Sequence, residues 1–148
     1  MMAARQPAPE AFVLRRSYPV PPPAVWRAWV DAAVLRVWFG QVDAPEWHAQ
    51  MDVRVGGRYR LRMRGPDGRY YVAYGAYREV VAGQKLVFTW TWKEGADTEA
   101  VITVLLKQAG EGTELEFTLD PVVDPRERDA WRADFKRLEA LLQNSRQT

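Results

Sequence analysis

The pattern of apolar and polar residues predicts one strand and two short helices at the start of the chain. Residues 11–18 are predicted to form a strand, and the prolines at 19–23 end it because proline cannot donate to a ladder. Apolar residues then recur at i, i+3 and i+4 within 26–30, which predicts a helix. Asp31 is a suitable N-cap for a second helix with the same spacing over 35–39, and Gly40 is a suitable terminator.

From about residue 46 the apolar period changes to two, which predicts antiparallel strands with one buried face. Turns are expected at Gly56-Gly57, Gly65-Pro66-Asp67-Gly68 and Glu94-Gly95-Ala96-Asp97. Gly75 marks a candidate bulge within one strand. The predicted strands are 51–55, 58–64, 69–81, 85–93, 99–107 and 113–119.

The C-terminal segment is predicted to be a long amphipathic helix. Asp124 fits the N-cap, Pro125 the first helical position and Glu127 the third. An apolar stripe follows at Trp131, Phe135, Leu138 and Leu142. The predicted fold is therefore α+β. A curved antiparallel sheet of six to seven strands wraps around this helix, with the two short helices after the first strand.

Composition narrows the classes of function. The chain has 148 residues, which favours one domain over residues 11–145 after a disordered segment 1–10. Its net charge of +2 gives no argument for nucleic acid, and no apolar run is long enough to span a membrane. Zero Cys excludes disulfides, thiolate nucleophiles and Cys-ligated zinc. Because the first ten residues lack the apolar segment of a secretory signal, we expect a cytoplasmic location.

No constellation of reactive side chains is visible. His48 is the single His, and neither Ser17 nor Ser145 lies in a nucleophile elbow. Catalytic residues, metal ligands and cofactors are therefore expected to be absent. Carboxylates expected to face solvent or to cap a helix are Glu114, Glu116, Asp124, Asp129 and Asp134.

Short aromatic-rich segments follow one another in a fixed order along these elements. They are Val25-Trp26-Arg27-Ala28-Trp29-Val30-Asp31, Trp38-Phe39, Asp52-x-Arg54-x-Gly56-Gly57-x-Tyr59, Gly75-x-Tyr77, Leu86-x-Phe88-Thr89-Trp90, Gly112-Thr113-x-Leu115 and the helix at Trp131. This ordered set, over residues 12–143, resembles the START and birch-pollen-allergen superfamily, which implies the helix-grip fold. Within it, the chain looks like the family of activator of heat-shock protein 90 ATPase homologues (AHSA1-like).

The resemblance implies a pocket between sheet and C-terminal helix, where relatives in the superfamily bind lipids, hormones or polyketides. The first hypothesis is non-enzymatic binding of a small apolar or aromatic molecule there, with Tyr and Trp side chains orienting it and Gly75 leaving room. The same rings could instead fill the space, because an empty cavity of about 300 Å³ would cost several kcal/mol at ~24 cal/mol per Å³. The expected lining is Trp38, Phe39, Tyr59, Gly75, Tyr77, Phe88, Trp90, Trp131 and Phe135.

Two alternatives stay open beside ligand binding. One is a co-chaperone-like interaction module that stimulates a heat-shock-protein-90-type ATPase, and the other is a cyclase or hydrolase with a pKa-shifted polar group in the pocket. Partners other than a small molecule would then be a chaperone or another protein, and a homodimer is left open. A row of arginines is interpreted either as a docking face or as solvated surface, with its aromatic neighbours on the opposite side: Arg54, Arg58, Arg60, Arg62 and Arg64.

Overall fold

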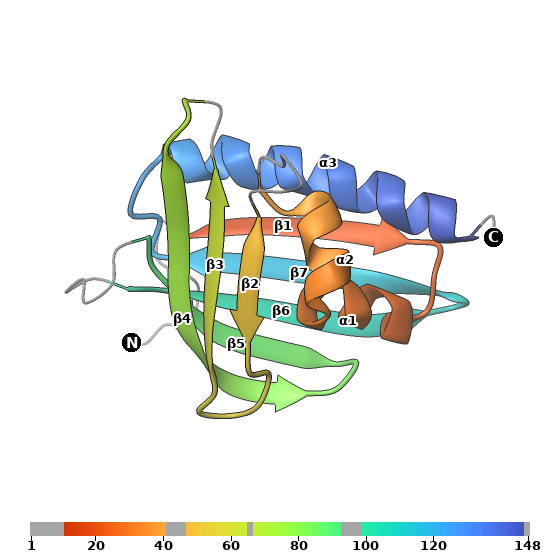
Figure 1. Ribbon diagram of the computed structural model, residues 1–148. Coiled ribbons are helices and arrows are strands. Elements are labelled where there is room, and N and C mark those ends of the chain that lie inside the picture. Colours follow the sequence, from red (N-terminus) through yellow and green to blue (C-terminus); the bar gives the residue numbers. More distant parts are fainter. Residues whose placement is uncertain (1–10, 41–46, 65–66, 93–98, 147–148) are drawn as a thin grey trace, which may run out of the picture.

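The computed structural model describes residues 11–40, 47–64, 67–92 and 99–146, and its elements follow the predicted order (Figure 1). Predicted features at 1–10, at Gly65-Pro66 and at 94–97 lie outside the described residues. The elements are β1 (Phe12–Tyr18), α1 (Pro22–Val30), α2 (Ala32–Trp38), β2 (His48–Met51), β3 (Arg58–Arg64), β4 (Tyr70–Val81), β5 (Lys85–Trp90), β6 (Ala100–Ala109), β7 (Gly112–Asp120) and α3 (Arg126–Arg146).

The seven strands form one antiparallel sheet in the order β1-β7-β6-β5-β4-β3-β2. β4 connects the two parts of this sheet. Its first half pairs with β3, and its second half pairs with β5, with a bulge between Tyr77 and Glu79. The bulge, rather than Gly75, is where the register shifts. As Figure 1 shows, β2, β3 and the start of β4 stand at a steep angle to the other strands, so the sheet curves around an interior.

The two short helices begin and end where the sequence indicates. Pro22 and Pro23 occupy the first turn of α1, where the missing N–H has no intrahelical partner to lose. Asp31 caps α2, because its carboxylate accepts a hydrogen bond of 3.0 Å from the Ala33 N–H. Gly40 follows the helix with a φ of +77°, as a C-terminal glycine should.

The predicted stripe of α3 is buried against the concave face of the sheet. Trp131, Phe135, Leu138 and Leu142 are each at most 3% exposed. Asp124 accepts a hydrogen bond from the Arg126 N–H, and the helix begins there, one residue later than predicted. The α+β helix-grip architecture is thus confirmed, and none of the helices in the described residues is long and apolar enough to cross a bilayer.

One predicted strand lies earlier in the chain than expected, at His48–Met51 and not at 51–55. β2 ends at Met51, and residues 52–57 form a tight turn in which the Gly57 N–H donates to the Arg54 carbonyl. Gly57 is required at this position because a Cβ there would lie 1.9 Å from the Asp52 carbonyl oxygen. Alternation of Val53 and Val55 with polar residues therefore reflected a turn, not a continuing strand.

Removing one ring of this interior should destabilise the fold strongly. Phe135 is 1% exposed and its ring contacts Trp29, Trp38 and Phe117. We expect Phe135→Ala to lower the free energy of unfolding by about 3–5 kcal/mol in urea titrations. Val37→Ala, on the exposed side of α2, should change it by less than about 0.5 kcal/mol. Similar midpoints for both variants would contradict this account of the core.

Candidate functional site

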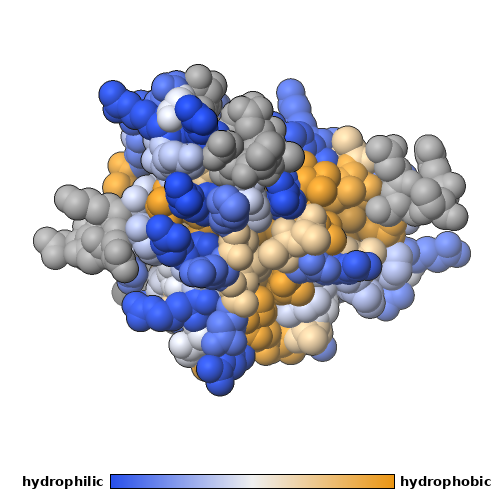
Figure 2. Space-filling model, in the orientation of Figure 1, coloured by the Kyte–Doolittle hydropathy of each residue, from blue (hydrophilic) through white to orange (hydrophobic). Residues whose placement is uncertain are grey.

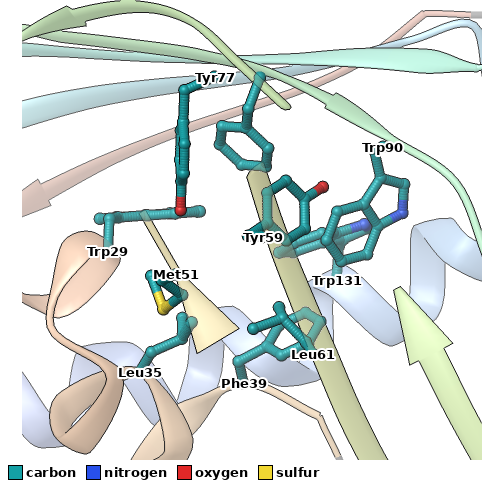
Figure 3. Close-up of a pocket in the computed structure, with 10 residues that line it drawn as sticks. Trp29, Leu35, Phe39, Met51, Tyr59, Leu61, Tyr77, Trp90 and Trp131 are labelled. Carbon is teal, nitrogen blue, oxygen red and sulfur yellow. The ribbon is translucent and has the colours of Figure 1, made fainter. Parts of the chain in front are cut away.

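The interior between sheet and helices is nearly filled by aromatic rings (Figure 3). The void that remains is about 30 Å³, which is room for about one water. Six of the predicted lining residues surround it, together with Trp29, Leu35, Met51 and Leu61, which the prediction omitted. The six are Phe39, Tyr59, Tyr77, Phe88, Trp90 and Trp131. The rings therefore act as filling in this part of the molecule.

Trp38 and Tyr59 of the predicted lining bind their polar atoms within the protein, whereas the buried indole N–H of Trp29 has no hydrogen-bond partner in the described part of the chain. Trp38, 0% exposed, does not line the void, and its indole N–H donates to the Ala28 carbonyl over 2.9 Å. The Tyr59 hydroxyl donates to the Thr89 carbonyl over 2.5 Å, and burial raises the pKa of Tyr59 well above its usual value. Phe135 also lies away from the void, packed among other rings.

Gly75 serves the packing of the sheet, which corrects the expectation that it leaves room for a ligand. A Cβ at this position would lie 2.0 Å from the Thr89 carbonyl oxygen and 2.4 Å from the Tyr59 hydroxyl. The space that the missing side chain leaves is thus taken by the Tyr59–Thr89 hydrogen bond.

A larger hollow opens at the side of the interior, next to the first half of α3. Its volume is about 370 Å³, within the range of ~300–1,000 Å³ typical of small-molecule pockets. Phe39, Trp90 and Trp131 line both this open pocket and the interior void. Further lining residues are Gly40 after α2, Met63, Asp67 and Tyr71 from the β3–β4 region, Trp92 after β5, and Glu127, Ala130, Ala133, Asp134 and Arg137 of α3.

Glu127 ties the end of β5 to the first turn of α3. One carboxylate oxygen, Oε2, accepts hydrogen bonds of 3.0 Å from the indole N–H groups of both Trp90 and Trp92. Glu127 is only 9% exposed. Its place in the first helical turn is favourable for a negative charge, because the helix N-terminus has a partial positive charge.

Asp134, two turns further along α3, ties the helix to the end of α2. Its Oδ1 accepts a hydrogen bond of 3.2 Å from the Gly40 N–H and pairs with Arg137. Arg137 also donates to the Trp38 and Gly40 carbonyls over 3.0 and 3.1 Å. Burial raises the pKa of Asp134 to about 7, and the nearby Arg137 guanidinium opposes the shift only in part.

Asp134 contradicts the expectation that its side chain faces solvent. The side chain of Asp134 is only 6% exposed. The spacing along the chain could have predicted this burial. Asp134 lies three residues after Trp131 and four before Leu138, so the three side chains share one face of the helix. Glu127 likewise precedes Trp131 by four residues. Asp129 does face solvent, as predicted.

Asp134 is the carboxyl group of the described pocket lining whose pKa is raised toward neutrality, a property typical of a general acid or base. The enzyme hypothesis therefore retains one candidate group and stays a prediction. His48 is exposed on β2, and within the described ranges no cluster of three or more His, Asp or Glu side chains could hold a metal.

The arginines of β3 lie on its outer side, and Figure 2 shows this face of the molecule with hydrophilic groups next to a hydrophobic area. Arg58, Arg60 and Arg62 take part in none of the ion pairs among the described residues, whereas Arg54, in the preceding turn, pairs with Asp52. Within β3 the aromatic neighbour of the arginines, Tyr59, faces the opposite side of the sheet, as predicted. Two tyrosines of the neighbouring strand β4 lie on the same side as the arginines. There, Tyr70 and Tyr74 stack under arginines: the Arg62–Tyr70 distance is 4.1 Å and the Arg60–Tyr74 distance is 6.0 Å, each to the ring centroid.

Comparison with known proteins agrees with this architecture. The family described as "Activator of Hsp90 ATPase homolog 1-like protein" matches residues 19–143, so the chain belongs to this family. No match was found among the curated proteins.

Several solved structures share the fold. Protein CV1439 from Chromobacterium violaceum is 26% identical, with a TM-score of 0.77 over 91% of this chain and 98% of that one. The Mll3558 protein from Rhizobium loti is 27% identical, with a TM-score of 0.71 over 88% and 94%. Protein NE0264 from Nitrosomonas europaea is 22% identical, with a TM-score of 0.72 over 91% and 95%, a likeness of fold alone.

Stability should depend on pH through Asp134. The folded protein, with an Asp134 pKa of about 7, holds a proton that the unfolded chain, at 3.8, has lost. This contribution to stability is therefore complete below the unfolded pKa and is lost as pH rises through the window from 3.8 to about 7. The loss should be up to about 1.4 kcal/mol per pH unit.

Denaturant titrations across that window should show a shallower decline for Asp134→Asn than for the wild-type protein. Asp129→Asn is the matched control, because the Asp129 side chain is 91% exposed on the same helix. Its pH dependence should parallel that of the wild type. Parallel curves for all three proteins would show that Asp134 does not titrate differently on folding.

Proposed function

We propose that this protein, as a member of the activator of Hsp90 ATPase homologue family, binds a small molecule with a flat apolar body in the open pocket beside α3, without transforming it. The observation that supports this most is the difference between the two hollows. The interior void has room for about one water, whereas the open pocket has about 370 Å³.

The rings of the pocket are suited to stacking because other aromatic rings of the core hold them in position. Trp131 packs on Phe117 at 4.7 Å and on Phe39 at 5.3 Å between ring centroids. Trp90 meets Trp131 at 5.4 Å, and its N–H is held by Glu127. Because Trp90 and Trp131 are each only 3% exposed, most of the aromatic surface that a ligand ring would bury belongs to Trp92 and Tyr71, each 41% exposed.

The helix side of the pocket is left open by two small side chains. Ala130 and Ala133 are exposed and lie between Glu127 and Asp134 along α3. Larger side chains at these positions would extend into the pocket while leaving the buried stripe unchanged. Ala140 is exposed on the same helix and is not among the residues that line the open pocket, so it offers a matched control.

Filling the pocket should displace the ligand. Protein purified from the cells that naturally express it should show a co-purified small molecule by native mass spectrometry. In Ala130→Leu the occupancy should fall at least about tenfold, a loss of roughly 1.4 kcal/mol in binding, whereas Ala140→Leu should resemble the wild type. An adduct of equal occupancy in all three proteins would place the ligand elsewhere. No adduct in any of them would count against a resident ligand.

The arginine face supports a second candidate function, docking of an acidic protein such as a heat-shock-protein-90-type ATPase. Arg58, Arg60 and Arg62 form a cationic surface with no carboxylate partner among the described residues. Complementary charge of this kind accelerates association and orients partners.

If that function holds, the protein should stimulate ATP hydrolysis by the chaperone of the same cell. The charge reversal Arg58→Glu/Arg60→Glu should reduce the stimulation at least about tenfold, since several close charge pairs would become repulsive. Lys136→Glu, an exposed charge reversal on α3, is the control and should leave it unchanged. An ATPase rate that the wild-type protein does not alter would remove this candidate.

A further inference from the structure

We propose that the molecule bound in the open pocket is an organic cation, an ammonium group on an apolar body, and that Glu127 binds its charge. This inference rests on the proposed ligand-binding function and specifies the chemical class of the ligand.

The charged groups around the pocket favour a positive ligand. Among the described residues, its lining contains three carboxyl groups, Asp67, Glu127 and Asp134, but a single guanidinium, that of Arg137. Arg137 is already occupied by Asp134 and by the carbonyls of Trp38 and Gly40. An anionic ligand would therefore meet an excess of negative charge, with no free cation among the lining residues that the structure describes.

Glu127 is the group that most needs a positive partner. It is nine-tenths buried, and none of the ion pairs among the described residues includes it. Both indole hydrogen bonds go to Oε2, so Oε1 has no hydrogen-bond partner in the described part of the chain. A buried carboxylate is costly without a counter-charge. The helix N-terminus and the two indoles offset part of that cost, and a bound ammonium would supply the missing charge.

The aromatic lining suits the same ligand. Faces of Trp, Tyr and Phe attract a cation that lies within about 6 Å of the ring centroid, and Trp is the strongest of the three. Trp90, Trp92 and Trp131 line the pocket beside Glu127, with Tyr71 also in the lining. Rings with a carboxylate among them favour a quaternary or tertiary ammonium over a neutral molecule of equal shape, because both attractions require the charge.

The spacing along α3 indicates how such a molecule would lie. Glu127 and Asp134 are seven residues apart, about 10.5 Å along the helix axis, with Ala130 and Ala133 between them. An ammonium at Glu127 leaves this stretch for an apolar body next to Trp131 and Phe39. The body would be as long as one or two rings.

Two probes of equal shape, one charged and one neutral, measure the contribution of the positive charge to binding. Benzyltrimethylammonium and its uncharged carbon analogue, neopentylbenzene, should be titrated against the full chain while tryptophan fluorescence is measured. We expect the cation to bind at least about tenfold more tightly than the neutral probe, a difference of roughly 1.4 kcal/mol. Benzenesulfonate, the anionic comparison, should bind more weakly than either.

Glu127→Gln should bring the two dissociation constants within about threefold of each other, because the amide oxygen still accepts from the indoles but has no charge. Glu111→Gln, an equal change of charge in the exposed β6–β7 turn, should keep the tenfold preference. Ala130→Leu should weaken binding of both probes. If Glu127→Gln fails to fold, the comparison of probes on the wild-type protein still decides.

The outcomes separate this inference from the function on which it rests. Equal or tighter binding of the neutral probe to the wild-type protein, weakened by Ala130→Leu, overturns the positive charge and leaves the binding function in place. A tenfold preference that survives in Glu127→Gln overturns the role of Glu127. Absence of binding by every probe, with no adduct lost in Ala130→Leu protein from native cells, overturns both.

Discussion

The rest of the structure depends on the packing of one face of α3 into the concave side of the sheet. Trp131 and Phe135 meet Phe117 of β7 at 4.7 and 5.3 Å between ring centroids, and Trp29 of α1 joins them at about 6 Å. Each such ring buries a large apolar area, on the order of 150–250 Å². This contact holds the helix, the short helices and the strands together, and it leaves little space in the middle. A ligand can therefore enter only where the rings stop.

The rings stop at the N-terminal half of α3 for a reason that is visible in the chain. The stripe that fills the sheet uses Trp131 and residues after it, whereas the turn before Trp131 has Glu127 and Ala130 at the corresponding surface. A short side chain and a carboxylate cannot fill the gap to β5. The open pocket is thus the region in which the helix lacks large apolar side chains. Glu127, which lines the pocket at this end of the helix, is held in place by hydrogen bonds from two indole N–H groups.

Local rules were enough to predict most of the fold, and the site required contacts between distant segments. Asp31 and the apolar stripe of α3 could be predicted because a cap and a helical period depend on neighbours in sequence. Gly75 could not be interpreted correctly, because its purpose is a hydrogen bond between Tyr59 and Thr89, which belong to β3 and β5. The burial of Asp134 could have been predicted from the helical period of the apolar residues. Its link to Gly40 could not, because that contact joins residues 94 positions apart.

The way the polar atoms of the interior are used also determines what kind of selectivity the pocket can have. The indole N–H groups of Trp90 and Trp92, which line the open pocket, both donate to Glu127, so in the proposed site they would offer a ligand ring faces but no hydrogen bonds. Ring faces discriminate weakly between neutral molecules of similar shape and respond strongly to positive charge. Within the described lining, Tyr71 donates to Asp67 and Arg137 pairs with Asp134, which leaves Glu127 as the charged side chain without an ion-pair or carboxylate partner of its own. Selectivity in such a pocket must therefore come from electrostatics and size, with the helix as the source of both.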